Sequence, residues 1–144
     1  MRKGVTVKVV LDANWYVSAC INRKSRRTLY QYILKNVGIK AYYSQELLTE
    51  FADVISRAKF RKYVTLEQAE RLKAIVLRFV IKVHIDSQPC VARDVCDNYL
   101  LGLCESCRAH YLVSGDRDLL ILRSHKAISI LTMGQFIQVV GVIH

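Results

Sequence analysis

Acidic and polar residues follow directly after two apolar runs of the sequence. The run VKVVL ends on Asp12, and the run YLV is followed by Ser114, Asp116 and Asp118. Such runs predict buried strands, and open α/β sheets collect their ligands at the carboxyl ends of their strands. We therefore expect carboxylates at one edge of a sheet. A second interpretation of Asp12 stays open, because an Asp before a short helix can cap its N-terminus.

A third acid is predicted to face the protein interior. In the helix expected over 95–109, a turn of about 100° per residue puts Asp97 on one stripe with Leu100, Leu101 and Cys104. A carboxylate at such a position is costly unless it binds a cation or a metal ion. Asp97 is therefore a candidate functional residue.

Glu50 is the fourth candidate acid, in the helix expected over 44–58. It borders the apolar arc of this helix, whereas Glu46 and Asp53 are predicted to face solvent. An edge glutamate whose stem covers apolar surface explains the pattern equally well. The residues expected in the arc are Leu47, Phe51, Val54, Ile55 and Ala58.

These four carboxylates, if they converge, predict a site for a hard divalent cation. Crowded carboxylates repel one another and raise each other's pKa, and Mg²⁺ or Mn²⁺ removes that repulsion. Zinc fits less well, because the histidines at 84, 110, 125 and 144 show no ligand spacing with the cysteines. Cys104 and Cys107 form a CxxC, but inside a predicted helix we interpret them as small buried thiols.

Composition bounds the class of protein. The chain has 144 residues, 52% of them hydrophobic, and this length predicts one domain over 1–144. Its net charge of +10 suggests a polyanionic partner. Five cysteines without a disulfide framework indicate a cytoplasmic location. No apolar run approaches the roughly 18–20 residues that span a bilayer, so we expect a soluble protein that does not enter membranes.

Strand and helix signals alternate along the chain, which predicts an α/β fold with a mainly parallel central sheet between two helical layers. Two capping boxes, Thr65 with Gln68 and Thr132 with Gln135, mark helix starts. The expected strands are 5–11, 40–43, 81–85, 111–114 and 128–131. The expected helices are 25–37, 44–58, 65–80 and 95–109, a turn from 116 and a last helix from 133.

The motifs together resemble a PIN domain, the small ribonuclease fold of the VapC-type toxins of toxin–antitoxin pairs. The resemblance rests on VVLDANWYVSA, SQELLTEFADVISRAKF, ARDVCDNYLLGLCESCRAHYLVSGDRDLL and ISILTMGQFI, in family order. It departs from the usual pattern at Ala13, Val95, Cys96 and Ser114, none of which removes a carboxylate.

The resemblance implies metal-dependent hydrolysis of RNA phosphodiester bonds. It implies Asp12 and Asp97 as direct ligands of Mg²⁺ or Mn²⁺, Asp116 as a direct or water-mediated ligand, and Glu50 as a ligand or general base. Asn14, Ser114 and Asp118 would support these carboxylates. The partners implied are RNA, an antitoxin protein and a second copy of the chain.

Two basic segments supply candidate contacts to RNA, although charge runs are often only solvated faces. The candidate residues are Arg23, Lys24, Arg26, Arg27, Arg57, Lys59, Arg61 and Lys62. A non-catalytic module that binds RNA or a protein partner is the main alternative function. A phosphatase of the haloacid-dehalogenase type fits less well, because it needs a second Asp where this chain has Asn14.

Overall fold

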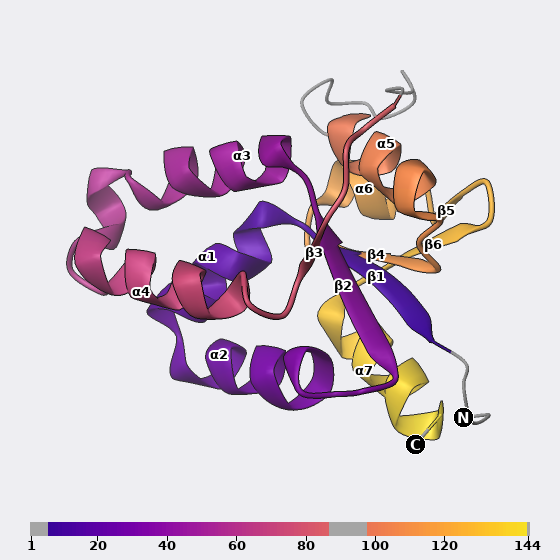
Figure 1. Ribbon diagram of the computed structural model, residues 1–144, viewed down its shortest axis with the longest axis horizontal. Coiled ribbons are helices and arrows are strands. Elements are labelled where there is room, and N and C mark those ends of the chain that lie inside the picture. The colour runs from indigo at the N-terminus through magenta and orange to yellow at the C-terminus, as the bar shows by residue number, and fades with distance from the viewer. Residues whose placement is uncertain (1–5, 87–97, 144) are drawn as a thin grey trace.

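The computed structural model describes residues 6–86 and 98–143, and these form six strands and their connecting helices (Figure 1). The strands are β1 (Val7–Leu11), β2 (Ile39–Tyr43), β3 (Ile81–Lys82), β4 (Tyr111–Val113), β5 (Ser124–His125) and β6 (Ile128–Leu131). The α-helices are α1 (Ala13–Ile21), α2 (Arg23–Leu29), α3 (Gln45–Ile55), α4 (Leu66–Val76), α5 (Asn98–Cys107), α6 (Arg117–Leu120) and α7 (Met133–Ile143). A π-helical turn, Tyr30–Leu34, follows α2, and a 3₁₀ turn, Ala58–Phe60, follows α3.

The strands form one sheet in the order β3-β2-β1-β4-β6-β5, parallel throughout except for β5. Strand β1 lies at the centre, and its residues Val9, Val10 and Leu11 have no exposed surface because helices cover both faces of the sheet. Leu11 pairs in register with Val113 of β4. The chain segments that leave these two strands therefore start side by side.

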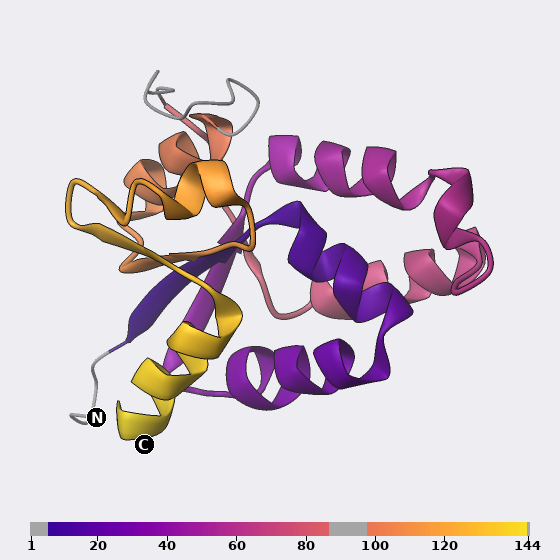
Figure 2. The same ribbon diagram turned by 180° about the vertical axis from the view of Figure 1, so that it is seen from behind.

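The helices lie in two layers about the sheet. Figures 1 and 2 show α1 to α4 and α7 on one side of the strands and α5, with α6 near it, on the other. The α/β class and the mainly parallel sheet predicted from the sequence are confirmed. Both predicted capping boxes are also confirmed by reciprocal hydrogen bonds of 2.9–3.2 Å.

Helix α3 ends three residues earlier than predicted. The buried arc holds Leu47, Phe51, Val54 and Ile55, but Ala58 is exposed and that part of the prediction is wrong. The reason is local: Arg57 has extended backbone angles (φ −64°, ψ 138°), which break the helix before the 3₁₀ turn.

Other boundaries differ in a similar way. The helix predicted to reach residue 80 ends at Val76, and the strand predicted over 81–85 has two paired residues. Strand β5 was not predicted, because two residues carry no periodic pattern. Asp97, which was predicted to face the interior from this part of the chain, lies outside the described residues.

The CxxC cysteines pack into the protein interior, as predicted. Cys104 and Cys107 are free thiols on α5, both buried, and burial raises the pKa of the Cys104 thiol.

Within residues 6–86 and 98–143, no helix has both the length and the apolar character needed to cross a membrane.

Candidate active site

Asp12 joins the end of β1 to the start of α1, and its two carboxylate oxygens have different partners. Oδ1 accepts a hydrogen bond from the Trp15 N–H at 3.1 Å, which caps α1. Oδ2 accepts one from the Ser114 hydroxyl at 2.5 Å. The capping interpretation is therefore correct but incomplete, because the same carboxylate also reaches the end of the neighbouring strand.

Ser114 links Asp12 to the loop after β4. Its hydroxyl has no exposed surface, donates to Asp12 and accepts from the Asp116 N–H at 3.0 Å. The Asp116 carboxylate in turn accepts from the Asp118 N–H at 2.9 Å and caps α6. Ser114 thus joins the Asp12 carboxylate to the backbone of Asp116, whose own carboxylate caps α6.

Glu50 approaches this network from α3. The Ser44 hydroxyl caps the helix by accepting from the Leu47 N–H, and the apolar arc packs against the core. This leaves Glu50 half-buried at the border of the arc, where the Tyr99 hydroxyl at the start of α5 donates to Oε2. Sequence patterns did not indicate Tyr99, since a tyrosine inside an apolar helix has the appearance of a core residue.

The electrostatic environment of Asp12 favours a cation. Only 4% of the residue is exposed, and burial raises the pKa of its carboxyl above the ordinary value of 3.8. The Glu50 carboxylate raises that pKa further, while hydrogen bonds from Ser114 and two backbone N–H groups oppose the rise. Among the described residues, no Lys, Arg or His forms an ion pair with Asp12, Glu50 or Asp116.

The described carboxylates do not by themselves form a metal site. No three His, Cys, Asp or Glu side chains within the described ranges lie close enough together to hold one ion. Asp12, Glu50 and Asp116 nevertheless offer hard oxygen donors, and a buried carboxylate with a raised pKa and no cationic partner is the type of group that a divalent cation stabilises. The fourth predicted ligand, Asp97, immediately precedes α5 and lies outside the described residues.

The two remaining predicted supporting residues are Asn14 and Asp118. Asn14 is exposed on the first turn of α1 and forms no hydrogen bond with the candidate acids within the described chain. Asp118 takes part through its backbone N–H, which donates to Asp116. Ser114 contacts a predicted ligand directly through its side chain, by the hydrogen bond to Asp12.

A groove runs along the exposed face of α3 beside Glu50. Its walls include Glu46, Glu50 and Asp53 from the helix and Lys82 and His84 from the chain at β3. Glu46 and Asp53 face out, as predicted. The groove gives solvent, and any substrate, access to Glu50 from the α3 side.

The predicted basic residues follow the ends of α1 and α3, and one of them, Arg57, lines the groove beside Glu50. Figures 1 and 2 place both basic segments at the ends of α1 and α3 that are remote from the sheet. Asp12 stands at the opposite end of α1, whose nine residues span roughly 13 Å at 1.5 Å per residue.

Three of the basic side chains are already engaged within the protein. Arg26 Nε donates to the Ala19 carbonyl at 3.1 Å, and Arg57 pairs with Asp53 at 3.5 Å. The Arg61 guanidinium donates to the Ile55 carbonyl at the end of α3. Its Nε and Nη1 are buried without a hydrogen-bond partner in the described part of the chain. The other members of the set are all exposed: Arg23, Lys24, Arg27, Lys59 and Lys62.

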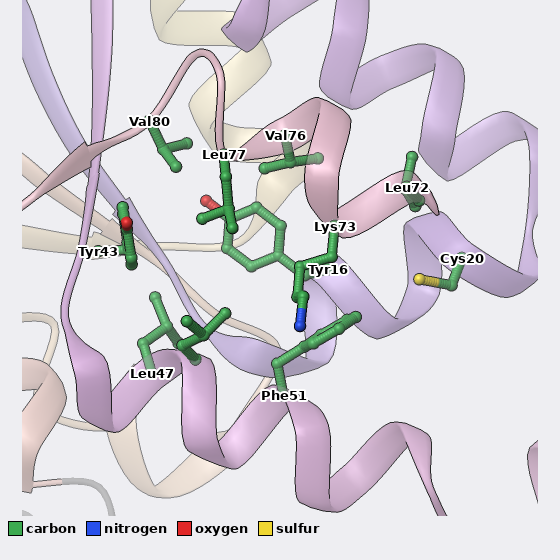
Figure 3. Close-up of a pocket in the computed structure, with 11 residues that line it drawn as sticks. Tyr16, Cys20, Tyr43, Leu47, Phe51, Leu72, Lys73, Val76, Leu77 and Val80 are labelled. Atoms are coloured by element: carbon green, nitrogen blue, oxygen red, sulfur yellow. The ribbon is translucent and has the colours of Figure 1, made fainter. Parts of the chain in front are cut away.

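An apolar cavity of about 40 Å³ lies between α1, α3 and α4 (Figure 3). Tyr16 lines it together with Leu47, Phe51 and Val76. The Tyr16 hydroxyl is buried and has no hydrogen-bond partner among the described protein groups. Burial and the Asp12 carboxylate, four residues earlier in the chain, raise the pKa of this phenol.

The mainly parallel sheet and its covering helices define the class of the protein, an α/β protein with Asp12 and Asp116 after the carboxyl ends of two neighbouring strands. The sequence model of the PIN domain matches residues 8–118, which include Asp12, Glu50, Asp97 and Asp116. The chain therefore belongs to the PIN domain family, whose members are generally nucleases and typically use divalent metals. No significant match to this chain is found among curated proteins.

Proposed function

We propose that this protein is a divalent-metal-dependent endoribonuclease that acts on single-stranded or looped RNA. The observation that carries the proposal is the state of Asp12: a buried carboxylate whose pKa is raised, tied through Ser114 to the Asp116 loop and repelled by Glu50. Such an arrangement is unfavourable without a cation, and it lies at the sheet edge where α/β proteins bind ligands.

The carboxylates divide into ligands and a candidate base. Asp12, Asp97 and Asp116 would hold Mg²⁺ or Mn²⁺, with Glu50 as a further ligand or the general base. When bound, the ion supplies a water of lowered pKa and neutralises charge at the scissile phosphate. Ser114 fixes the direction of the Asp12 carboxylate, and the surrounding core keeps bulk water from it. Glu50 Oε1 is the atom available to accept the proton of an attacking water.

RNA is the substrate that the surface charge favours. The net charge of +10 attracts polyanions, and the exposed cations at the far ends of α1 and α3 can contact phosphates of a strand that extends from the acids. A flexible single strand can follow this path past α3.

We further propose a biological role as the toxin of a toxin–antitoxin pair, acting in the cytoplasm. The support is the resemblance to VapC-type toxins together with membership of the PIN family. The test is to coexpress the protein with the product of a small neighbouring gene. Copurification of the two proteins, and suppression of RNA cleavage by the second protein, would support this role. Cleavage unaffected by that partner would contradict it.

A cleavage assay on a labelled single-stranded RNA tests the enzymatic proposal. We expect cleavage with Mn²⁺ or Mg²⁺, none after chelation, and a loss of at least about 100-fold in Asp12→Asn, since the ligands act as a unit. Binding of the RNA without cleavage, under any divalent ion, would instead indicate a non-catalytic RNA-binding module.

A further inference from the structure

We infer that Tyr99 is a positioning residue that holds Glu50 in its working orientation, an inference that rests on the proposed nuclease function. The Tyr99 hydroxyl donates a hydrogen bond to Glu50 Oε2 across the boundary between α5 and α3. Only 8% of Tyr99 is exposed, so its ring is fixed in the core while its hydroxyl reaches the half-buried carboxylate.

The other acids of α3 show why this hydrogen bond matters. Glu46 and Asp53 lie along the same groove, and both are exposed; Asp53 pairs with Arg57 across one turn of the helix. A glutamate has three rotatable bonds, and at the border of the groove it can turn outward in the same way. The hydrogen bond from Tyr99 selects the orientation in which Glu50 turns toward α5.

The chemistry of a phenol suits this role. A tyrosine hydroxyl donates one hydrogen bond and leaves the carboxylate charged, whereas a lysine or arginine would neutralise it. With Oε2 accepting from Tyr99, Oε1 stays available to bind an ion or accept a proton. Tyr99 also follows Asp97 by two residues, so the helix that begins after one predicted ligand fixes the orientation of another.

The test compares Tyr99→Phe with a matched control that loses a phenol elsewhere. Tyr111→Phe serves as the control, because Tyr111 packs on Phe136 with a ring distance of 5.6 Å, away from the acids. Tyr99→Phe should lower kcat by about 10–100-fold, the usual effect of losing a group that orients a ligand, with KM for RNA within about two-fold of wild type. Mn²⁺ binding, measured by calorimetry, should weaken by a similar factor. Tyr111→Phe should leave both unchanged.

A double-mutant cycle shows whether the hydrogen bond exists independently of metal. Tyr99→Phe and Glu50→Ala, alone and combined, are unfolded with urea in chelator, and their effects on stability should be non-additive. Additive effects would overturn the inference. If wild type cleaves RNA and Tyr99→Phe cleaves it equally well, the positioning role is wrong but the proposed nuclease function stands. A wild type that neither binds Mn²⁺ nor cleaves RNA would overturn the proposed function and the positioning role together.

Discussion

The Ser114 hydroxyl donates a 2.5 Å hydrogen bond to Asp12 Oδ2, joining two residues that lie 102 positions apart in the chain. The parallel pairing of β1 with β4 aligns Leu11 with Val113, so the next residues along each strand meet. A buried carboxylate and a fully buried hydroxyl are thus each satisfied by the other.

Replacement of Ser114 by Ala should destabilise the protein by about 1.5–3 kcal/mol at pH 7, because a buried ionised group loses a hydrogen bond. Urea unfolding measures the change. Ser114→Thr retains the hydroxyl and should recover most of the loss in stability. If Ser114→Ala were as stable as wild type, the hydroxyl would not contribute to holding Asp12.

The raised pKa of Asp12 makes the stability of the folded protein depend on pH. In metal-free protein the folded state binds this proton more tightly than the unfolded state, so stability from this group falls as pH rises through the folded pKa. Asp12→Asn removes the effect, and the variant should be at least as stable as wild type at pH 7. Its advantage should shrink as pH falls toward 3.8, the ordinary value. An advantage that did not change with pH would contradict the assignment.

The pairing of Asp12 with Ser114 has local sequence signals. A β-branched run ending in Asp12, and a second run before Ser114 and Asp116, are patterns of neighbouring residues. The hydrogen bond between Tyr99 and Glu50 has no such signal, because it depends on how α5 packs beside α3. Helix periodicity places Glu50 at the border of its arc but cannot show which helix it meets.

The ends of helices and the positions of the basic residues were harder to predict, because both depend on how the helices pack in three dimensions. Nothing in the sequence near Arg57, such as a Gly or Pro, marks the end of α3. The two basic segments differ in their relation to the acids: Arg57 lines the groove beside Glu50, whereas the segment after α1 begins at the end of that helix opposite to Asp12.

The Tyr16 hydroxyl supplies a test of the cavity. Because this buried hydroxyl has no hydrogen-bond partner among the described groups, Tyr16→Phe should leave the protein equally stable or more stable, by about 1 kcal/mol. Thermal melting at equal protein concentration measures the effect. A clear loss of stability would show that the hydroxyl forms a hydrogen bond that the protein needs.

The basic residues should fall into two groups, one that affects RNA binding and one that affects the stability of the protein. Neutralising the exposed Lys24 and Arg27 to Gln should reduce the dependence of RNA affinity on salt, by up to about 0.7 in logarithmic slope for each phosphate that is no longer neutralised. Arg61→Gln should instead lower thermal stability, since its guanidinium binds the end of α3. A salt dependence unchanged by Lys24→Gln and Arg27→Gln would place the RNA on another surface.

The most direct test of the metal-dependent site is the melting temperature of wild type and Asp12→Asn, each with and without millimolar Mn²⁺. An ion that binds only the folded state stabilises it by mass action, so wild type should melt higher with Mn²⁺ and the variant should respond little. Without metal the variant should melt at the same temperature as wild type or higher, because the substitution replaces a buried carboxylate, which Glu50 repels, by a neutral amide. Equal responses to Mn²⁺ in the two proteins, or none in wild type, would contradict the account.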